Sequence, residues 1–154
     1  MQKFLLYSFL GLALFVACSK DKFEDKPTIE IKSINPTYVS ALSGAYAEIE
    51  MEFTDKQGDL DSVFLYKNRL NINQKPLLNP YLPYPLPDFP EKSKGVLKVT
   101  LQNTDLAATG SPNTKPDEPF GKEPDTINFK IVVKDKSGNV SDTITTDQLI
   151  IERS

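Results

Sequence analysis

The chain contains no histidine, no tryptophan and a single cysteine among its 154 residues. Without histidine there is no Ser-His-Asp or Cys-His nucleophile system and no imidazole metal ligand. A single cysteine excludes an intrachain disulfide, a cysteine-rich zinc site and a CxxC redox pair. Lysine and arginine (18) are outnumbered by aspartate and glutamate (21), so no nucleic-acid partner is expected, since that would need a basic excess. The carboxylates show no spacing that singles out an acid/base pair, and we therefore expect no enzyme.

The cysteine stands at the end of an apolar segment. Residues 1–3 supply one positive charge, and residues 4–17 are apolar except for Ser8. This run is shorter than the roughly 20 apolar residues of a membrane-spanning helix. A basic start, an apolar middle and small residues at the end are typical of an export signal. Cys18 follows directly after the small residue Ala17.

The sequence FVACS at residues 15–19 resembles the lipobox of bacterial lipoproteins, although Phe15 stands where leucine is usual. The following CSKD resembles the start of Bacteroidota lipoproteins, in which such residues can favour surface display. The resemblance implies a signal peptide at 1–17, a lipidated N-terminus and tether at 18–27, and acyl chains on Cys18 that anchor the protein in the outer membrane. The alternative is an ordinary cleaved signal peptide with an incidental cysteine.

Residues 28–154 show strand-like alternation and little helical periodicity. In residues 46–53, for example, Ile49, Met51 and Phe53 share one face, and residues 127–133 alternate in the same way. Turn-forming residues separate the runs. We therefore expect one all-β domain, an antiparallel β-sandwich of about seven strands.

Two segments of this domain correspond to each other. FTDKQGDLD at 53–61 and VKDKSGNVS at 133–141 each contain a strand end, then Asp-Lys-polar-Gly-Asp/Asn, then an apolar residue. Glycine supplies the positive φ of such turns, and aspartate caps the turn backbone. Both segments resemble parts of immunoglobulin-like or fibronectin-III-like domains. The resemblance implies an immunoglobulin-like sandwich in which the segments link strands B–C and F–G at the same pole.

These turns carry a candidate calcium site. Asp55, Asp59 and Asp61 are close in sequence, and Asp135 and Asn139 would join them if the two loops share a pole. Calcium takes six to eight oxygen ligands, which Asp and Asn side chains can supply, although the spacing does not match an EF-hand. The alternative is a pair of Asx-stabilised turns on a solvated edge, with no cofactor.

A proline-rich segment carries candidate ligand-binding residues. Residues 76–90, PLLNPYLPYPLPDFP, hold six prolines, so a central strand is excluded and an extended, polyproline-like excursion is expected. Tyr81, Tyr84 and Phe89 would present aromatic rings to sugars or to a partner protein. The alternative is a lid that packs over an open sheet face. The polar segment 103–124 is expected to be a surface connection anchored by Phe120.

These observations together predict a non-catalytic, lipid-anchored cell-envelope protein that binds a glycan or a protein partner. The alternatives are a structural or assembly component of an envelope complex and a calcium-stabilised adhesion module.

Overall fold

Strands make up nearly all regular structure in the computed structural model, which describes residues 26–42, 44–72, 75–115 and 117–153. Within these segments the one helix is α2 (Asn103–Leu106), a single turn. The all-β class expected from the sequence is confirmed. None of the described helical structure is long and apolar enough to cross a membrane.

The first sheet, sheet A, has three antiparallel strands in the order β1-β3-β6: β1 (Thr28–Asn35), β3 (Tyr46–Thr54) and β6 (Lys94–Gln102). The apolar residues of β3 share one face, as the alternation in the sequence predicted. Ala47, Ile49, Met51 and Phe53 point inward and are buried, while the residues between them face outward.

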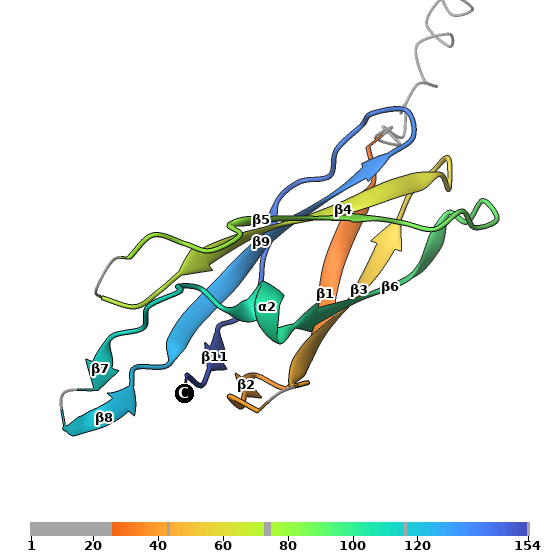
Figure 1. The fold of residues 1–154 in the computed structure, drawn as a ribbon. Coiled ribbons are helices and arrows are strands. Elements are labelled where there is room, and N and C mark those ends of the chain that lie inside the picture. The colour runs from red at the N-terminus through yellow and green to blue at the C-terminus, as the bar shows by residue number, and fades with distance from the viewer. Residues whose placement is uncertain (1–25, 43, 73–74, 116, 154) are drawn as a thin grey trace, which may run out of the picture.

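The second sheet, sheet B, is larger and has the order β2-β11-β9-β4-β5: β2 (Tyr38–Val39), β11 (Leu149–Ile151), β9 (Asp125–Asp135), β4 (Leu60–Arg69) and β5 (Tyr81–Pro85). A short strand, β10 (Ile144–Thr145), also pairs with β9. The β2–β11 pair is parallel, and the other pairs are antiparallel. A separate hairpin of β7 (Thr114–Lys115) and β8 (Glu118–Lys122) projects at the end of the molecule opposite the start of β1 (Figure 1).

One hydrophobic core draws side chains from both sheets. Ile49 and Met51 come from sheet A, and Leu65, Phe129 and Ile131 come from sheet B; all are fully buried. Burying a side chain of this size contributes about 1.5–3 kcal/mol relative to leaving it exposed. The shared core therefore holds the two sheets together.

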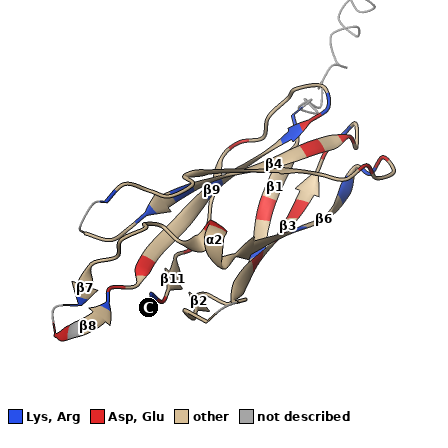
Figure 2. Ribbon diagram, in the orientation of Figure 1, with Lys and Arg blue, Asp and Glu red and all other residues tan. Residues whose placement is uncertain are grey.

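The outer face of sheet A is charged, as Figure 2 shows along β1 and β3. Lys98 Nζ lies 3.1 Å from Glu48 and 2.9 Å from Glu50, and Lys32 Nζ lies 2.9 Å from Glu52. Each exposed pair of this kind contributes no more than about 1 kcal/mol. The main effect of these charged side chains is to keep the outer face of sheet A solvated.

The proline-rich segment forms the edge of sheet B. Residues 81–85 pair with β4 as strand β5, with Leu82 opposite Leu65, rather than forming a polyproline-like excursion. Proline is tolerated there because an edge strand leaves one side of its backbone unpaired. The expected packed lid is realised in part, since Leu82 is buried and Leu86 packs against the core.

The segment 103–124 is anchored differently from the expectation. Phe120 is 97% exposed, so its predicted role as an anchor is wrong. It belongs to the β7–β8 hairpin, whose strands pair with each other. Leu106 and Ala108 are fully buried and fasten the segment to the core instead.

The two similar turns lie side by side. The backbone N–H of Lys136, after β9, donates to the carbonyl of Asp59, before β4, at 3.0 Å. The glycines of both turns have positive φ, +73° at Gly58 and +93° at Gly138. The two glycines differ in the atoms that surround them. A Cβ on Gly58 would lie 2.6 Å from the Lys92 backbone nitrogen, whereas one on Gly138 would meet nothing within 4 Å.

The two glycines provide a matched test. Gly138→Ala should cost about 1 kcal/mol of unfolding free energy, because only the left-handed conformation is penalised. Gly58→Ala should cost about 2 kcal/mol, because the Lys92 backbone must also move. Chemical denaturation of both variants measures the difference. Equal losses would show that the contact with Lys92 is unimportant.

Candidate functional site

The outer face of sheet B carries three neighbouring aromatic rings, which we call the aromatic face: Phe64, Tyr66 and Tyr81. Tyr66 on β4 is paired with Tyr81 on β5, and their ring centroids are 5.0 Å apart. The rings of Phe64 and Tyr81 are 5.8 Å apart and nearly parallel, at 10°. Tyr66 and Tyr81 remain 47% and 43% exposed. The rings thus form a continuous surface that is accessible to solvent.

The alternation of β4 places two of these rings outward. Val63 and Leu65 point into the core and are fully buried, so Phe64 and Tyr66 face the other way. Pro83 is paired with Phe64 and adds a compact apolar neighbour. β5 and the middle of β4 carry no charged residue (Figure 2). The aromatic face therefore differs sharply from the charged outer face of sheet A.

Polar side chains adjoin the rings along β4 and the neighbouring strand β9. Asn68 is paired with Asn128 on β9, and its Nδ2 donates to Asn128 Oδ1 at 3.2 Å. One such bond leaves each amide with further donors and acceptors. Lys130, exposed on β9, is paired with Tyr66. The surface thus combines aromatic rings with amide and ammonium groups.

The structure separates the three aromatic residues predicted from the sequence. Tyr81 belongs to the aromatic face, but Tyr84 packs against the core, where burial and the nearby Asp105 carboxylate raise the pKa of its hydroxyl to about 12. Phe89 also packs against the core, with its ring 6.5 Å from that of Phe53. The partners that Tyr81 does have, Phe64 and Tyr66, were missed. The alternation of residues 63–66 could have indicated that Phe64 and Tyr66 point outward.

A second group of functional side chains, the carboxylate cluster, consists of Asp55, Asp59 and Asp135. One oxygen from each of the three lies within 4.8 Å of the others. Asp55 follows Phe53 by two residues and Asp135 follows Val133 by two, so each extends the inward face of its strand. Both are fully buried as a result.

The other two residues of the predicted calcium site have different positions. Asp61 is not part of the cluster and accepts a hydrogen bond from the Ser62 hydroxyl. Asn139 supports the cluster from outside. It donates its backbone N–H to Asp135 Oδ1 at 2.7 Å and its side-chain amide to Asp135 Oδ2 at 2.8 Å.

A further buried charged group lies toward the other end of β4 and β9: Lys67, Arg69, Asp125 and Arg153. Arg69 Nε is 3.3 Å from Asp125 Oδ1, and Arg153 Nη1 is 3.5 Å from Asp125 Oδ2. Lys67 Nζ donates to the carbonyls of Leu78 and Ala107 at 3.0 and 2.8 Å. Burial lowers the pKa of the Lys67 amine to about 8. These contacts connect β4, β9, the segment before β5 and the segment after α2, so the group has a structural role.

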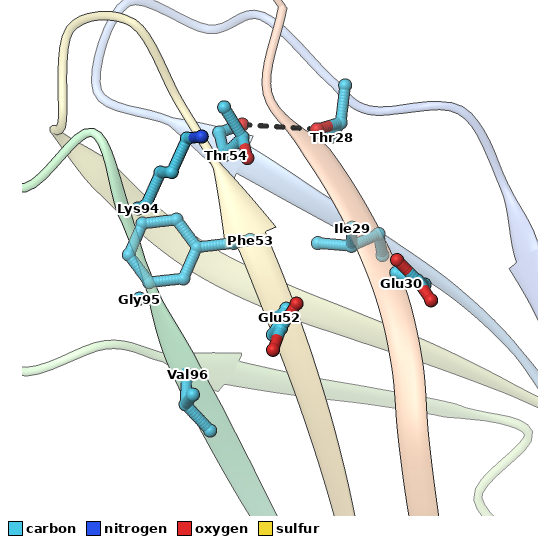
Figure 3. A pocket seen from close by; sticks show the side chains of 9 residues that line it. All are labelled: Thr28, Ile29, Glu30, Glu52, Phe53, Thr54, Lys94, Gly95 and Val96. Atoms are coloured by element: carbon cyan, nitrogen blue, oxygen red, sulfur yellow. Dashed lines mark hydrogen bonds between the residues drawn. The ribbon is translucent and has the colours of Figure 1, made fainter.

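A hollow of about 660 Å³ lies at one end of sheet A (Figure 3). Figure 3 shows the Phe53 ring against Gly95, with Glu30, Glu52 and Lys94 around them. Glu30 and Glu52 are both paired with Lys32. Both acidic side chains of the hollow are thus engaged in ion pairs at the surface of sheet A.

Cys18, the predicted lipidation site, lies outside the described residues. In comparisons with known proteins, no protein-family model and no curated protein matches the chain.

Proposed function

We propose that this protein is a non-catalytic, lipid-anchored cell-envelope protein that binds glycans through its aromatic face. The observation that carries the proposal is the set of neighbouring rings of Phe64, Tyr66 and Tyr81 on the outer face of sheet B, of which Tyr66 and Tyr81 are exposed. The anchor is inferred from the resemblance around Cys18.

The chemistry of the aromatic face suits a sugar chain. The C–H faces of sugar rings pack on aromatic rings, which supply large apolar contact areas of fixed shape. Sugar hydroxyl groups need hydrogen-bond partners beside the rings, and the Asn68–Asn128 pair retains donors and acceptors there. A row of adjacent rings on an open sheet face matches an extended chain better than a small molecule, which normally needs a concave pocket.

The strand order supports an immunoglobulin-like sandwich of the kind expected from the sequence. The order β1-β3-β6 corresponds to strands A-B-E, and β11-β9-β4 corresponds to G-F-C, with β5 in the place of C′. In this assignment the two similar turns are the B–C and F–G loops, and the aromatic face is the outer surface of the C and C′ strands.

The double variant Tyr66→Ala/Tyr81→Ala should lose most glycan binding. Two central aromatic contacts are removed, which should cost at least about 2 kcal/mol, or about 30-fold in Kd. A glycan array probed with the full chain in mild detergent would identify the ligand, and calorimetry with that glycan would give the change in Kd. Tyr46→Ala is the matched control, because Tyr46 is 53% exposed but lies on sheet A.

Unchanged binding by the double variant, or an equal loss in Tyr46→Ala, would contradict the proposal. Lack of binding by the wild-type chain to every glycan on the array would also contradict it.

The second candidate is a structural or assembly component of an envelope complex. The observation that favours it is the exposure of large apolar residues toward the β7–β8 end: Phe120 is 97% exposed and Ile72 is 95% exposed. Exposed apolar side chains of this size are characteristic of protein contact surfaces when they form a patch. This candidate would be preferred if no glycan were bound.

A further inference from the structure

The carboxylate cluster has no ion-pair partner in the part of the chain that the structure describes. Among the ion pairs of the described residues, none involves Asp55, Asp59 or Asp135. Two of the three carboxylates are fully buried. Burying a charged group is costly unless an opposite charge pairs with it or it coordinates a metal.

Two buried oxygens of the cluster also have no hydrogen-bond donor. Asp55 Oδ2 accepts the backbone N–H of Asp59 at 2.8 Å, but Asp55 Oδ1 has no partner although the residue is fully buried. Asp59 Oδ1 is likewise buried and without a donor. Buried oxygens without a donor are rare in native proteins and call for an explanation. A bound cation would provide one, because an ionised carboxylate can only accept.

We infer that Asp55, Asp59 and Asp135 form a calcium-binding site that joins the two sheets. Calcium prefers oxygen ligands at about 2.3–2.6 Å, so two oxygens on opposite sides of one ion lie roughly 5 Å apart. The carboxylate oxygens here lie within 4.8 Å of one another, which fits that separation. The inference is independent of the proposed glycan binding.

The remaining ligands can be water molecules that enter from the surface. A cavity of about 210 Å³ adjoins Asp59, and its lining includes further acidic side chains: Asp61, Asp88 and Glu91. Three protein carboxylates alone do not reach six ligands, and water completes many calcium sites. The cavity offers space for this water beside Asp59.

The position of the site suggests what calcium would do. Asp55 follows β3 of sheet A, whereas Asp135 ends β9 of sheet B and Asp59 precedes β4. An ion bound by all three would tie the sheets together at this pole. Without it, the three carboxylates repel one another; burial, together with the charges of Asp55 and Asp135, raises the pKa of Asp59.

Thermal unfolding with CaCl₂ tests the inference on the full chain in mild detergent. At a Ca²⁺ concentration 100-fold above Kd, the Tm of the wild-type protein should rise by about 10 °C relative to EDTA. Mg²⁺ at the same concentration should raise it less, because it requires a tighter octahedral geometry. Calorimetric titration with CaCl₂ would give Kd.

The variant Asp59→Asn separates ion binding from a general loss of stability. In EDTA its Tm should equal or exceed that of the wild type, because one of three repelling charges is removed. Added Ca²⁺ should then raise its Tm much less than in the wild type. Asp147→Asn, which alters an exposed aspartate elsewhere, should keep the full calcium response.

Three results would overturn the inference. The first is an unchanged wild-type Tm with no heat of binding at about 10 mM CaCl₂, which is about ten times the weakest Kd of extracellular sites. The second is a full calcium response in Asp59→Asn, and the third is an equal or larger effect of Mg²⁺.

Discussion

Replacing Asp125 with alanine is expected to destabilise the protein by about 3–5 kcal/mol, because removing one partner of a buried ion pair leaves the other charge buried. Asp125 is fully buried and lies 3.3 Å from Arg69, whose side chain is 2% exposed. Its Oδ2 also accepts the backbone N–H of Ala108 at 3.1 Å. The variant would remove that acceptor and the carboxylate beside Arg69 and Arg153. Chemical denaturation of the full chain measures the loss.

Asp142→Ala is the matched control for this prediction. Asp142 pairs with Lys26 at 2.9 Å, but its side chain is 86% exposed, so the loss should stay below about 1 kcal/mol. Adding Arg69→Met to Asp125→Ala should recover part of the stability, because the buried guanidinium is removed as well. Similar losses in Asp125→Ala and Asp142→Ala would contradict the assignment of a buried charged group.

The stability of the protein is expected to rise between pH 7 and pH 10 because of Lys67. Burial lowers the pKa of its amine from 10.5 to about 8 in the folded protein. Between these two values the unfolded chain binds more protons than the folded chain, so stability increases with pH. The buried charge costs about 3 kcal/mol at pH 7, and about 2 kcal/mol of this should be relieved by pH 10.

The geometry around Lys67 is compatible with a neutral amine. Its Nζ donates to two backbone carbonyls, those of Leu78 and Ala107, and a neutral amine still has two N–H donors. Both hydrogen bonds can therefore survive deprotonation. Above pH 10 a different effect begins, because the raised pKa of Tyr84 makes its ionisation oppose folding.

Comparison with two variants isolates the contribution of Lys67. The unfolding free energy of the wild type, measured relative to Lys67→Met at each pH, should rise by about 2 kcal/mol from pH 7 to pH 10. Lys98→Met should show no such relative change, since pairing with Glu50 and Glu48 raises the pKa of the exposed Lys98. A flat difference between the wild type and Lys67→Met would refute the prediction.

Alternation in the sequence predicted the strands because it reflects a local rule. Successive side chains of a strand point to opposite faces, so the apolar positions of β3 and β9 are visible without any tertiary contact. The same alternation also places some charged residues of β4 at inward positions. Lys67 and Arg69 continue the inward positions of Val63 and Leu65, which places charged side chains inside the protein at the end of β4.

The candidate sites depended on the pairing of strands that are distant in sequence. Asp55 and Asp135 are recognisable as members of similar turns, but the separation of Asp61 from them is a consequence of the bulge where Leu60 and Ser62 pair with β9. Tyr81 was a candidate from its proline-rich context. Its association with Phe64 and Tyr66 required the pairing of β5 with β4, which no local pattern specifies.

The sequence by itself determined the chemical repertoire and the fold class. With no histidine or tryptophan and one cysteine, located at residue 18, residues 28–154 contain no imidazole, indole or thiol group, and their alternation requires strands. Only the tertiary structure decided which of these groups meet. It brought Asp55, Asp59 and Asp135 together, and it packed Tyr84 and Phe89 against the core while Tyr81 joined the aromatic face. The physical reason is that strand pairing and packing of two sheets are long-range contacts, and they alone set the neighbours of each outward or inward side chain.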